Sequence, residues 1–446
     1  MDELFHIDQM KAYCHGNFTY WNSKITTPPG LYIVSLAIIK PIHLIFDNTS
    51  VSTDFCSSSS VLRLVNFALL LSLFVTFRNT KRLLANNARY NAFALVVCNF
   101  PLIYFFTFLY YTDVGSTLFV TLAYYLSLRG RPWLSAVVGA LAVTFRQTNI
   151  VWLAFIASLR VYEQFRDARL YWAKKGFLHD TKHYDSVSEQ RDAYVGHLLK
   201  DIVLAAIWIP RLWLATARIV AADVAGYIAV ALCCVVFLVW NSGKVVLGHH
   251  EYHTASFHLA QVLYFGAFTV SMGWPYCFNI ARLSGYFYRI RRHKTTCFMI
   301  IVIITCVVHW FTYEHPFLLA DNRHYTFYIW RRWFRAHDAL KYVLVPLYSF
   351  GLYILFFSRF LCGQPAFYRL AFTFACLATL VPHQLLEFRY FIVPYVMWRL
   401  HVREESTKYF RNELATYLLI NAFTLYMFVF RPFELSNEPG VQRFMW

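Results

Sequence analysis

Charged residues are scarce in this chain of 446 residues, and their scarcity argues against an ordinary soluble domain. Asp, Glu, Lys and Arg make up 15% of the sequence, whereas 58% of the residues are apolar and 20% are aromatic. A soluble domain usually carries about 25% charged residues. The apolar residues also fall into blocks instead of alternating with polar ones. The sequence therefore predicts an integral membrane protein that contacts membrane lipid.

Metal-binding cysteine motifs are absent as well. The ten cysteines include no CxxC pair and no Cys/His spacing typical of a metal site, and most of them lie within apolar blocks. We therefore expect no metal and no other cofactor. Cys14 and Cys56 share one region with hydrophilic flanks, and the sequence leaves open whether they form a disulfide.

The net charge of +17 does not indicate nucleic acid as a partner, because the basic residues form no continuous face. They sit between the apolar blocks, where Lys and Arg in short loops mark the cytoplasmic side. One alternating set of loops holds about twice as many basic residues as the other. This set includes residues 160–200 and the run Arg289–Lys294, and we predict that it faces the cytosol.

Twelve apolar blocks approach the roughly 17–25 residues that a membrane-crossing helix needs. We predict spans at Val61–Phe77, Ala92–Tyr111, Val114–Leu128, Trp133–Phe145, Ile150–Val161, Val224–Trp240, His258–Ile280, Cys297–Phe311, Lys341–Ser358, Ala366–Pro382, Phe388–Leu400 and Leu414–Phe430. The fold class is thus an all-α polytopic membrane protein with about twelve spans.

The spans divide the chain into five predicted parts. These are a luminal loop with an interfacial helix at Leu31–Phe46 (1–60), spans one to five (61–161), a cytosolic insertion (162–223), spans six to twelve with luminal loops (224–430), and a luminal C-terminal tail (431–446). The apolar stretch Leu31–Phe46 is short for a span and is interrupted by Lys40-Pro41, which suits a helix that lies in the interface.

Polar clusters that suit chemistry all fall on the predicted luminal side, together with two possible N-glycosylation sites, Asn17 and Asn48. The clusters are Asp2 and Glu3, Asp113, Arg146, the group Asp321, Arg323 and His324, and the pair Glu387 and Arg389. Simpler interpretations stay open for several of them: a solvated terminus for Asp2 and Glu3, a helix cap for Asp113, a headgroup contact for Arg146, and a salt bridge for Glu387 and Arg389.

The basic residues of Ala320–Arg332 are not explained by the rule that Lys and Arg mark cytosolic loops. They lie among aromatic residues on the side of the membrane that should be poor in Lys and Arg. Arg323 offers planar, two-pronged hydrogen bonding that matches a phosphate. We therefore predict a phosphate site that includes Arg323 and His324.

Strings along the whole chain carry a family resemblance. They are MDELFHI (Met1–Ile7), YCHGNFTYWNSKITTPPGLY (Tyr13–Tyr32), FLYYTDVGS (Phe108–Ser116), FRQTNIVW (Phe145–Trp152), LLADNRHYTFYIWRR (Leu318–Arg332), LLEFRYFIVPY (Leu385–Tyr395) and QRFMW (Gln442–Trp446). With them the chain resembles the α-1,2-glucosyltransferases that add the last glucose to the dolichol-linked oligosaccharide in the endoplasmic reticulum. The segment Arg160–Asp201 matches poorly. The family has a helix before its Met-Asp-Glu, so we expect a thirteenth span upstream of Met1.

The resemblance implies a C-type glycosyltransferase bundle with its active site at the luminal membrane surface. The implied donor is dolichyl phosphate glucose, the acceptor is the diglucosylated dolichol-pyrophosphate oligosaccharide, and the transfer inverts the anomeric centre. Such a transfer needs one carboxylate as base and cationic groups for the leaving phosphate. The predicted base is Asp2, with Glu3 as its alternate or orienting partner, because neither has a basic neighbour before Lys11.

The remaining candidates receive supporting roles. For the donor phosphate we expect Arg323, His324 and Arg389, with Arg146 less favoured, and the further site carboxylates are Asp113, Asp321 and Glu387. Two other functions stay open at this stage. One is a related lipid-phosphate-dependent mannosyl- or glucosyltransferase, since only the resemblance separates the sugars. The other is a transporter or channel, although the sequence shows neither the internal repeat nor the mid-membrane polar segments typical of one.

Overall fold

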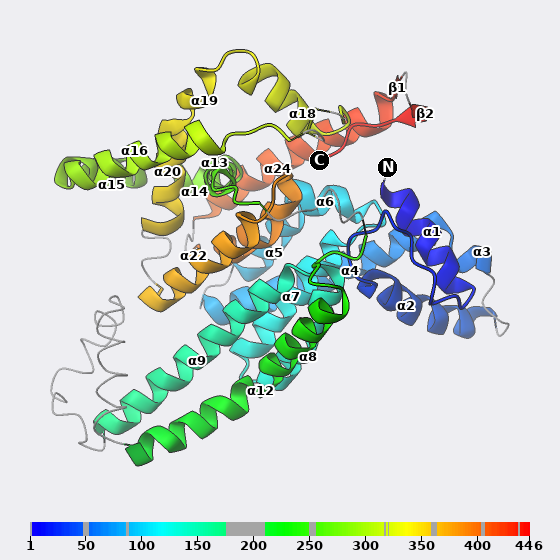
Figure 1. Cartoon of the computed structure of the whole chain (residues 1–446), viewed down its shortest axis with the longest axis horizontal. Helices are drawn as coiled ribbons and strands as arrows, with labels where there is room; N and C mark the ends of the chain where they lie inside the picture. The colour runs from blue at the N-terminus through cyan, green and yellow to red at the C-terminus, as the bar shows by residue number, and fades with distance from the viewer. Residues whose placement is uncertain are drawn as a thin grey trace.

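The structure, a computed structural model, is almost entirely helical (Figure 1). It describes residues 2–47, 53–85, 89–174, 210–248, 256–315, 318–319, 321–357, 364–402, 406–435 and 438–446. Residues 48–52, which include Asn48, and most of the predicted cytosolic insertion lie outside this set.

The described residues form helices along both halves of the chain. Those of the first half are α1 (Asp2–Cys14), α2 (Gly30–Asp47), α3 (Thr53–Cys56), α4 (Ser59–Leu84), α5 (Tyr90–Cys98), α6 (Pro101–Thr107), α7 (Asp113–Leu128), α8 (Pro132–Phe145), α9 (Asn149–Lys174) and α12 (Pro210–Trp240). Those of the second half are α13 (Ala260–Met272), α14 (Trp274–Cys277), α15 (Ile280–Arg292), α16 (Lys294–Phe311), α18 (Tyr325–Ile329), α19 (Leu340–Val343), α20 (Val345–Leu352), α22 (Ala366–Leu380), α23 (Ile392–His401) and α24 (Thr407–Phe430).

Shorter elements complete the chain. Two π-helical turns, η2 (Trp330–Phe334) and η3 (Tyr353–Phe357), extend α18 and α20, and a 3-10 turn, η4 (Phe388–Phe391), leads into α23. After α24 the strands β1 (Phe433–Leu435) and β2 (Glu438–Gln442) pair antiparallel.

Every predicted span overlaps one helix or a run of consecutive helices, which confirms the all-α polytopic fold class. Five helices among the described residues are long and apolar enough to cross a membrane, and the bent pair α5 and α6 makes a sixth. The pair meets at an angle of 64°, because Pro101 begins α6 and cannot continue the hydrogen bonds of α5. The count of twelve spans stays a prediction.

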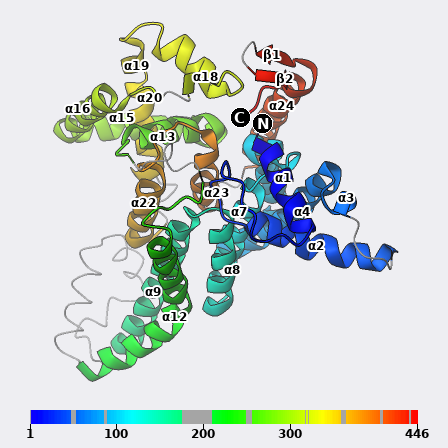
Figure 2. The same cartoon turned by 45° about the vertical axis from the view of Figure 1, so that its right-hand side comes forward.

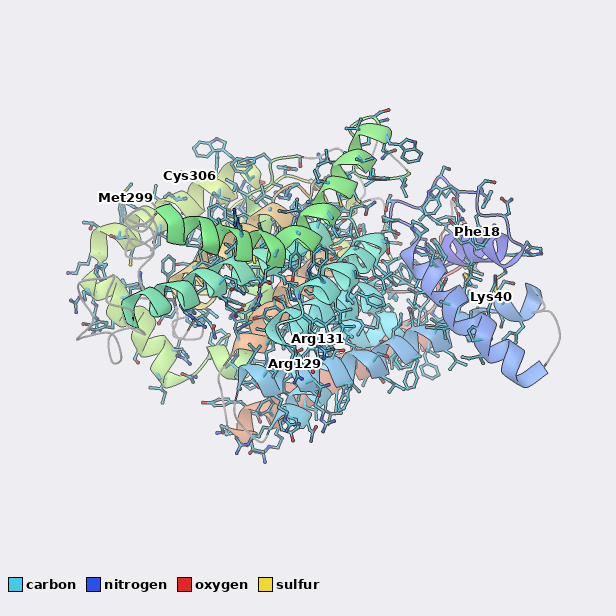
Figure 3. The ribbon with its side chains drawn as sticks, turned by 90° about the horizontal axis from the view of Figure 1, so that it is seen from below. Phe18, Lys40, Arg129, Arg131, Met299 and Cys306 are labelled. Atoms are coloured by element: carbon cyan, nitrogen blue, oxygen red, sulfur yellow. A yellow bond between two sulfur atoms is a disulfide. The ribbon has the colours of Figure 1, made fainter. Side chains whose placement is uncertain are left out.

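The outward faces of the long helices are apolar. On α16 the side chains of Phe298, Met299 and Ile303 are more than half exposed, and Figure 3 places Met299 and Cys306 at the periphery of the bundle. Exposure of so many apolar side chains on one helix is unfavourable in water but not in lipid. The exposed surface of α16 therefore fits a membrane-embedded helix.

The core of the bundle centres on α7. This helix packs against α4 on one side and against α8 on the other, while α9 packs against α12 and α22. A separate apolar cluster joins α1 and α2 to the bundle through buried residues such as Met10, Tyr32 and Phe145. The N-terminal helices are therefore packed against the bundle and not merely tethered to it.

The two chain ends lie at the same end of the molecule. Figures 1 and 2 place the N-terminal helix α1 and the C-terminal strands beside one another, on the same side as α18. The ends of α9 and α12 that flank residues 175–209 lie at the opposite end. The turn between α7 and α8, with Arg129 and Arg131, is also well apart from Phe18 and Lys40 (Figure 3).

Two of the predicted segments contain helix in the structure. The predicted insertion 162–223 is partly helical, since α9 continues to Lys174 and α12 begins at Pro210. Arg160 on α9 donates to Asp223 on α12 over 2.9 Å, and this ion pair explains why charged residues there remain helical. The apolar stretch Leu31–Phe46 lies within one helix, α2, which continues through Pro41.

Buried charges hold α23 in place, and α23 follows directly on residues 387–391. Arg399 and Glu413 are both fully buried and pair through two hydrogen bonds of 2.9 and 2.8 Å. Lys81 donates to the carbonyl groups of Leu400 and Val402 over 2.8 and 2.9 Å. Because a buried charge without a partner is costly, these bonds fix α23 against α24 and α4.

Candidate active site

A small cavity, partly open to solvent, lies where α7, the α8–α9 turn and η4 meet. Its lining consists of Asp113, Ser116, Thr117, Arg146, Thr148, Asn149, Trp152, Thr379, His383, Arg389, Tyr390, Ile392, Val393 and Pro394. Three of the predicted site residues, Asp113, Arg146 and Arg389, therefore line the same space although they come from three separate stretches of the sequence.

Asp113 lies between the two arginines. Its Oδ1 accepts a hydrogen bond from Arg146 Nη2 over 2.8 Å, and its Oδ2 is 3.7 Å from Arg389 Nε. The Asp113 side chain is 1% exposed, and those of Arg146 and Arg389 are 12% and 15% exposed. Among the residues that line the cavity, one carboxylate and two guanidinium groups carry one unit of positive charge in excess, which suits a singly charged anion. The Glu387 carboxylate, outside this lining, lies 3.9 Å from Arg389 Nε.

Close packing of α7 on α8 brings Asp113 to Arg146. A Cβ atom at Gly115 would overlap the ring of Phe145, so only glycine permits this approach. Asn149, the first residue of α9, donates to the hydroxyl of Ser116 and to the carbonyl of Ala142, both over 2.8 Å. The first turn of α7 is thus tied to α8 and α9. Asp113 also sits at the positive end of the α7 dipole, which favours its negative charge.

Arg389 is held from the other side by aromatic rings. Its guanidinium lies over the rings of Phe106 and Tyr111, 5.4 and 5.3 Å from their centroids. The next residue, Tyr390, stacks on His383 with the ring centroids 3.9 Å apart. Such stacking orients a guanidinium group, and Arg389 is one of the residues that line the cavity.

A second cluster contains Asp321, Arg323 and His324. Arg323 donates from Nε and Nη2 to the two carboxylate oxygens of Asp321, each over 2.7 Å, and from Nη1 to Gln442 over 3.1 Å. His324 Nδ1 is 2.9 Å from the main-chain oxygen of Trp446, and its Nε2 is 3.5 Å from Asp321. The structure therefore gives the predicted phosphate ligands Arg323 and His324 partners within the protein.

The charges of this cluster shift its pKa values. Burial raises the pKa of Asp321, but the hydrogen bonds from His324 and Arg323 outweigh burial and hold the pKa well below its usual range. Burial lowers the pKa of His324, but the hydrogen bond and the charge of Asp321 more than offset this effect and raise the pKa above its usual value. Asp321 is therefore a poor proton acceptor.

Glu387 connects the two clusters. Its Oε2 is 3.9 Å from Arg389 Nε, and its charge contributes to the raised pKa of His324. The sequence analysis offered a salt bridge between Glu387 and Arg389 as the simpler interpretation, and the distance fits a weak one. Glu387 therefore lies between the Asp113 site and the Asp321 loop.

Glu3 differs from its prediction. Its two carboxylate oxygens accept hydrogen bonds from Arg63 Nε and Nη2, each over 2.8 Å, and one of them also accepts from the main-chain N–H of Tyr110 over 2.8 Å. The expectation that Glu3 lacks a basic neighbour is therefore wrong, because Arg63 is distant in sequence and close in space. Asp2 begins α1, and the position of its side chain lies outside the description.

A disulfide joins Cys14, the last residue of α1, to Cys56, the last residue of α3, and their Cα atoms are 6.0 Å apart. The sequence left this pairing open. Asn17 is exposed, and its side-chain oxygen accepts a hydrogen bond from Thr19 over 2.9 Å. The glycosylation acceptor is thus accessible, which glycosylation requires.

Several residues around the cavity received no role from the sequence. Ser116, Asn149, His383 and Tyr390 line it, and Arg63 anchors Glu3. The sequence contained only weak indications of two of them. Asn149 begins an apolar run. Arg63 is a single charge inside an apolar block, where a charge suggests a specific partner.

Comparisons with known proteins agree with the resemblance. The profile of the DIE2/ALG10 family matches residues 1–400. A Dol-P-Glc:Glc(2)Man(9)GlcNAc(2)-PP-Dol alpha-1,2-glucosyltransferase from Arabidopsis thaliana is 35% identical over 496 residues, covering 100% of this chain and 94% of the relative. Proteins with the same name from Mus musculus and Yarrowia lipolytica are 34% and 33% identical, covering 100% of this chain and 93% and 92% of their own lengths. No solved structure matches. The chain belongs to the DIE2/ALG10 family.

Proposed function

We propose that this protein transfers glucose from dolichyl phosphate glucose to the diglucosylated dolichol-pyrophosphate oligosaccharide and forms the terminal α-1,2 linkage. The names of the full-length relatives support the reaction and both substrates. The observation in the structure that carries the proposal is the cavity in which Arg146 and Arg389 flank Asp113.

The charge of this cavity matches the donor. A dolichyl phosphate sugar is a phosphodiester with one negative charge, and among the residues that line the cavity the two arginines and one aspartate supply one positive charge in excess. In this proposal Arg389 and Arg146 bind the phosphate and stabilise the charge that develops on it as the glycosidic bond breaks. Asp113 positions both guanidinium groups, since each lies within 4 Å of one of its carboxylate oxygens.

The base in this proposal is Asp2. A β-linked donor and an α-linked product require inversion, so one carboxylate removes the proton of the acceptor hydroxyl in a single displacement. Glu3 supports this assignment as the orienting partner: its bonds to Arg63 and Tyr110 fix the first turn of α1 and therefore the backbone of Asp2. Arg323 and His324 take a supporting position beside the phosphate site instead of a direct one.

The proposed location is the membrane of the endoplasmic reticulum with the active site on the luminal side. The disulfide Cys14–Cys56 supports this side, because disulfides persist in oxidising compartments. The N-terminal helices that carry it pack on the same end of the bundle as the cavity, since α1 contacts Tyr110, three residues before Asp113.

The lipid-linked oligosaccharide profile of cells tests the proposal. Disruption of the gene for this chain should cause accumulation of dolichol oligosaccharide with two glucoses, and re-expression should restore the species with three. Membranes that contain the chain should use dolichyl phosphate glucose but not dolichyl phosphate mannose. Accumulation of a species truncated at a mannose would overturn the choice of glucose.

A further inference from the structure

We infer that the C-terminal segment, Gln442–Trp446, is a positioning element of the active site. It follows the last span, α24, and the strand pair β1 and β2, and it packs on the Asp321–Tyr325 loop and on η4. The inference rests on the proposed function, because it assigns the segment a role in presenting Arg389 to the donor phosphate.

Main-chain hydrogen bonds join the segment to the loop. The N–H of Met445 donates to the carbonyl of Arg323 over 2.9 Å, and the N–H of Tyr325 donates to the carbonyl of Met445 over 3.3 Å. His324 and Met445 thus pair in parallel, as two strands would. Met445 is 2% exposed, so this pairing is part of the packed interior and not a surface contact.

Side chains reinforce the pairing at both of its ends. Gln442 accepts the third hydrogen bond of the Arg323 guanidinium, whose other two bonds go to Asp321. The main-chain oxygen of Trp446 is 2.9 Å from His324 Nδ1. The segment therefore bonds directly to Arg323, His324 and Tyr325. It is linked to Asp321 through Arg323.

Trp446 extends this contact to the cavity. Its ring lies 5.2 Å from the ring of Tyr325 and 5.9 Å from the ring of Phe388. Phe388 opens η4, and the next residue is Arg389, which faces Asp113. A displacement of Trp446 would therefore release the turn that aims the Arg389 guanidinium.

The segment is also anchored to the end of the last span. Arg443 Nη1 donates to the carbonyl of Phe428 over 2.6 Å, within the last turn of α24. The C-terminal strands and the end of α24 lie beside α18 in both views (Figures 1 and 2). The family profile ends at residue 400, so this contact brings a part of the chain outside the profile to the edge of the proposed active site.

Substitution of Trp446 and Gln442 tests the inference with the full chain in membranes. Trp446→Ala should lower kcat/KM for dolichyl phosphate glucose about tenfold, since a small misplacement of a positioning group has large effects, while the KM for the acceptor stays within about twofold. Trp446→Phe, which retains a ring against Phe388, should recover most of the loss. Gln442→Leu is the second variant. Val441→Ala is the matched control, because Val441 is adjacent and 58% exposed.

Hydrogen exchange of the purified variants gives a readout that does not depend on activity. Trp446→Ala should speed exchange at residues 321–325 and 386–392 but not in α7. If Trp446→Ala is unstable, Gln442→Leu should show the same pattern more weakly. Exchange and donor kinetics equal to those of Val441→Ala would overturn the inference. If the unmodified chain does not use dolichyl phosphate glucose, the proposed function fails, and hydrogen exchange alone then decides whether the segment positions η4.

Discussion

Arg63 holds Glu3 through two parallel hydrogen bonds of 2.8 Å, although the two residues lie 60 positions apart. The pair joins α1 to α4 at the edge of the bundle. Both carboxylate oxygens of Glu3 are therefore engaged within the protein. This engagement is the reason that we assign Glu3 the orienting role and propose Asp2 as the base.

Substitution of the two carboxylates should separate these roles. Asp2→Asn keeps the shape of the side chain and removes the base, so we expect kcat to fall about 10²–10⁴-fold, the usual contribution of general base catalysis. Glu3→Gln should reduce kcat less and should lower thermal stability, because it weakens the bond to Arg63. Activity assays and thermal unfolding in detergent measure both effects.

Arg63→Gln is the control for this comparison, since it should reproduce the stability loss of Glu3→Gln. The loss should be modest, on the order of 1 kcal/mol, because the Arg63 side chain is 45% exposed and solvent screens the pair. If Asp2→Asn and Glu3→Gln both retain near-normal turnover, the base lies elsewhere, and Asp113 is the next carboxylate to test.

The donor phosphate should depend on Arg389 more than on Arg323. Arg389→Lys keeps the charge but loses the planar pair of donors, so we expect kcat/KM for dolichyl phosphate glucose to fall roughly 10–100-fold. Arg323→Lys should have a smaller effect, with the protein still inserted, because the Arg323 donors already serve Asp321 and Gln442. Arg331→Lys on an exposed position is the control. A larger loss for Arg323→Lys than for Arg389→Lys would return the phosphate to the Asp321 loop.

Much of the fold was predictable because lipid imposes a simple pattern. An apolar block must be helical in a bilayer, since every backbone N–H and carbonyl needs a partner within the segment. For this reason the twelve predicted blocks overlap helices. The bend between α5 and α6 was not predicted, although Pro101 marks it, because the apolar block continues through the proline.

The sequence identified individual residues of the site, but it did not show which of them lie together. Asp113, Arg146 and Arg389 were candidates on chemistry alone, yet their convergence depends on helix packing that no local pattern contains. Arg323 and Glu3 were also candidates, but the structure bonds them to other residues of the protein. Each has the right chemistry for the site, but their partners Gln442 and Arg63 lie 119 and 60 positions away, so the sequence could not show that their donors and acceptors are engaged.

The proposed luminal position of the first loop has a direct test. Asn17 is exposed, so we expect it to be glycosylated, and Asn17→Gln should remove an endoglycosidase-sensitive shift on a gel. Cys14 and Cys56 should react with a maleimide reagent only after reduction. Asn279→Gln is a control, because Asn279 is followed by Ile-Ala and is no acceptor. Free thiols at both Cys14 and Cys56 before reduction would contradict the luminal assignment.

Gly115 offers a test of how the cavity is built. Gly115→Ala should lower activity at least about tenfold, because its Cβ atom would overlap the ring of Phe145 and push α7 away from α8. The displacement separates Asp113 from Arg146. The double variant Gly115→Ala with Phe145→Leu should regain part of the activity by making room.

Gly285→Ala is the matched control for this substitution. Gly285 also lies in a helix, but a Cβ atom there meets only the hydroxyl of Tyr353, the far end of a side chain that can move. We expect activity within about twofold of the unmodified protein, since alanine favours a helix over glycine. Full activity of Gly115→Ala would show that the cavity does not need this close approach.

The pairing of His324 with Asp321 should make stability depend on pH in one direction. The pKa of His324 is raised in the folded protein, above the value of about 6.5 expected when unfolded. Its contribution to the free energy of unfolding is therefore complete below about pH 6.5 and is lost as the pH rises through the folded pKa. Asp321, whose pKa is lowered, stays ionised across this range.

The melting temperature of the unmodified protein should thus exceed that of His324→Gln by more at pH 6 than at about pH 8.5. In an Asp321→Asn background the same comparison should show little dependence on pH, because the charge that raises the pKa is gone. A difference that grows with rising pH would show that His324 is neutral in the folded protein and that the Asp321 pair does not stabilise the loop.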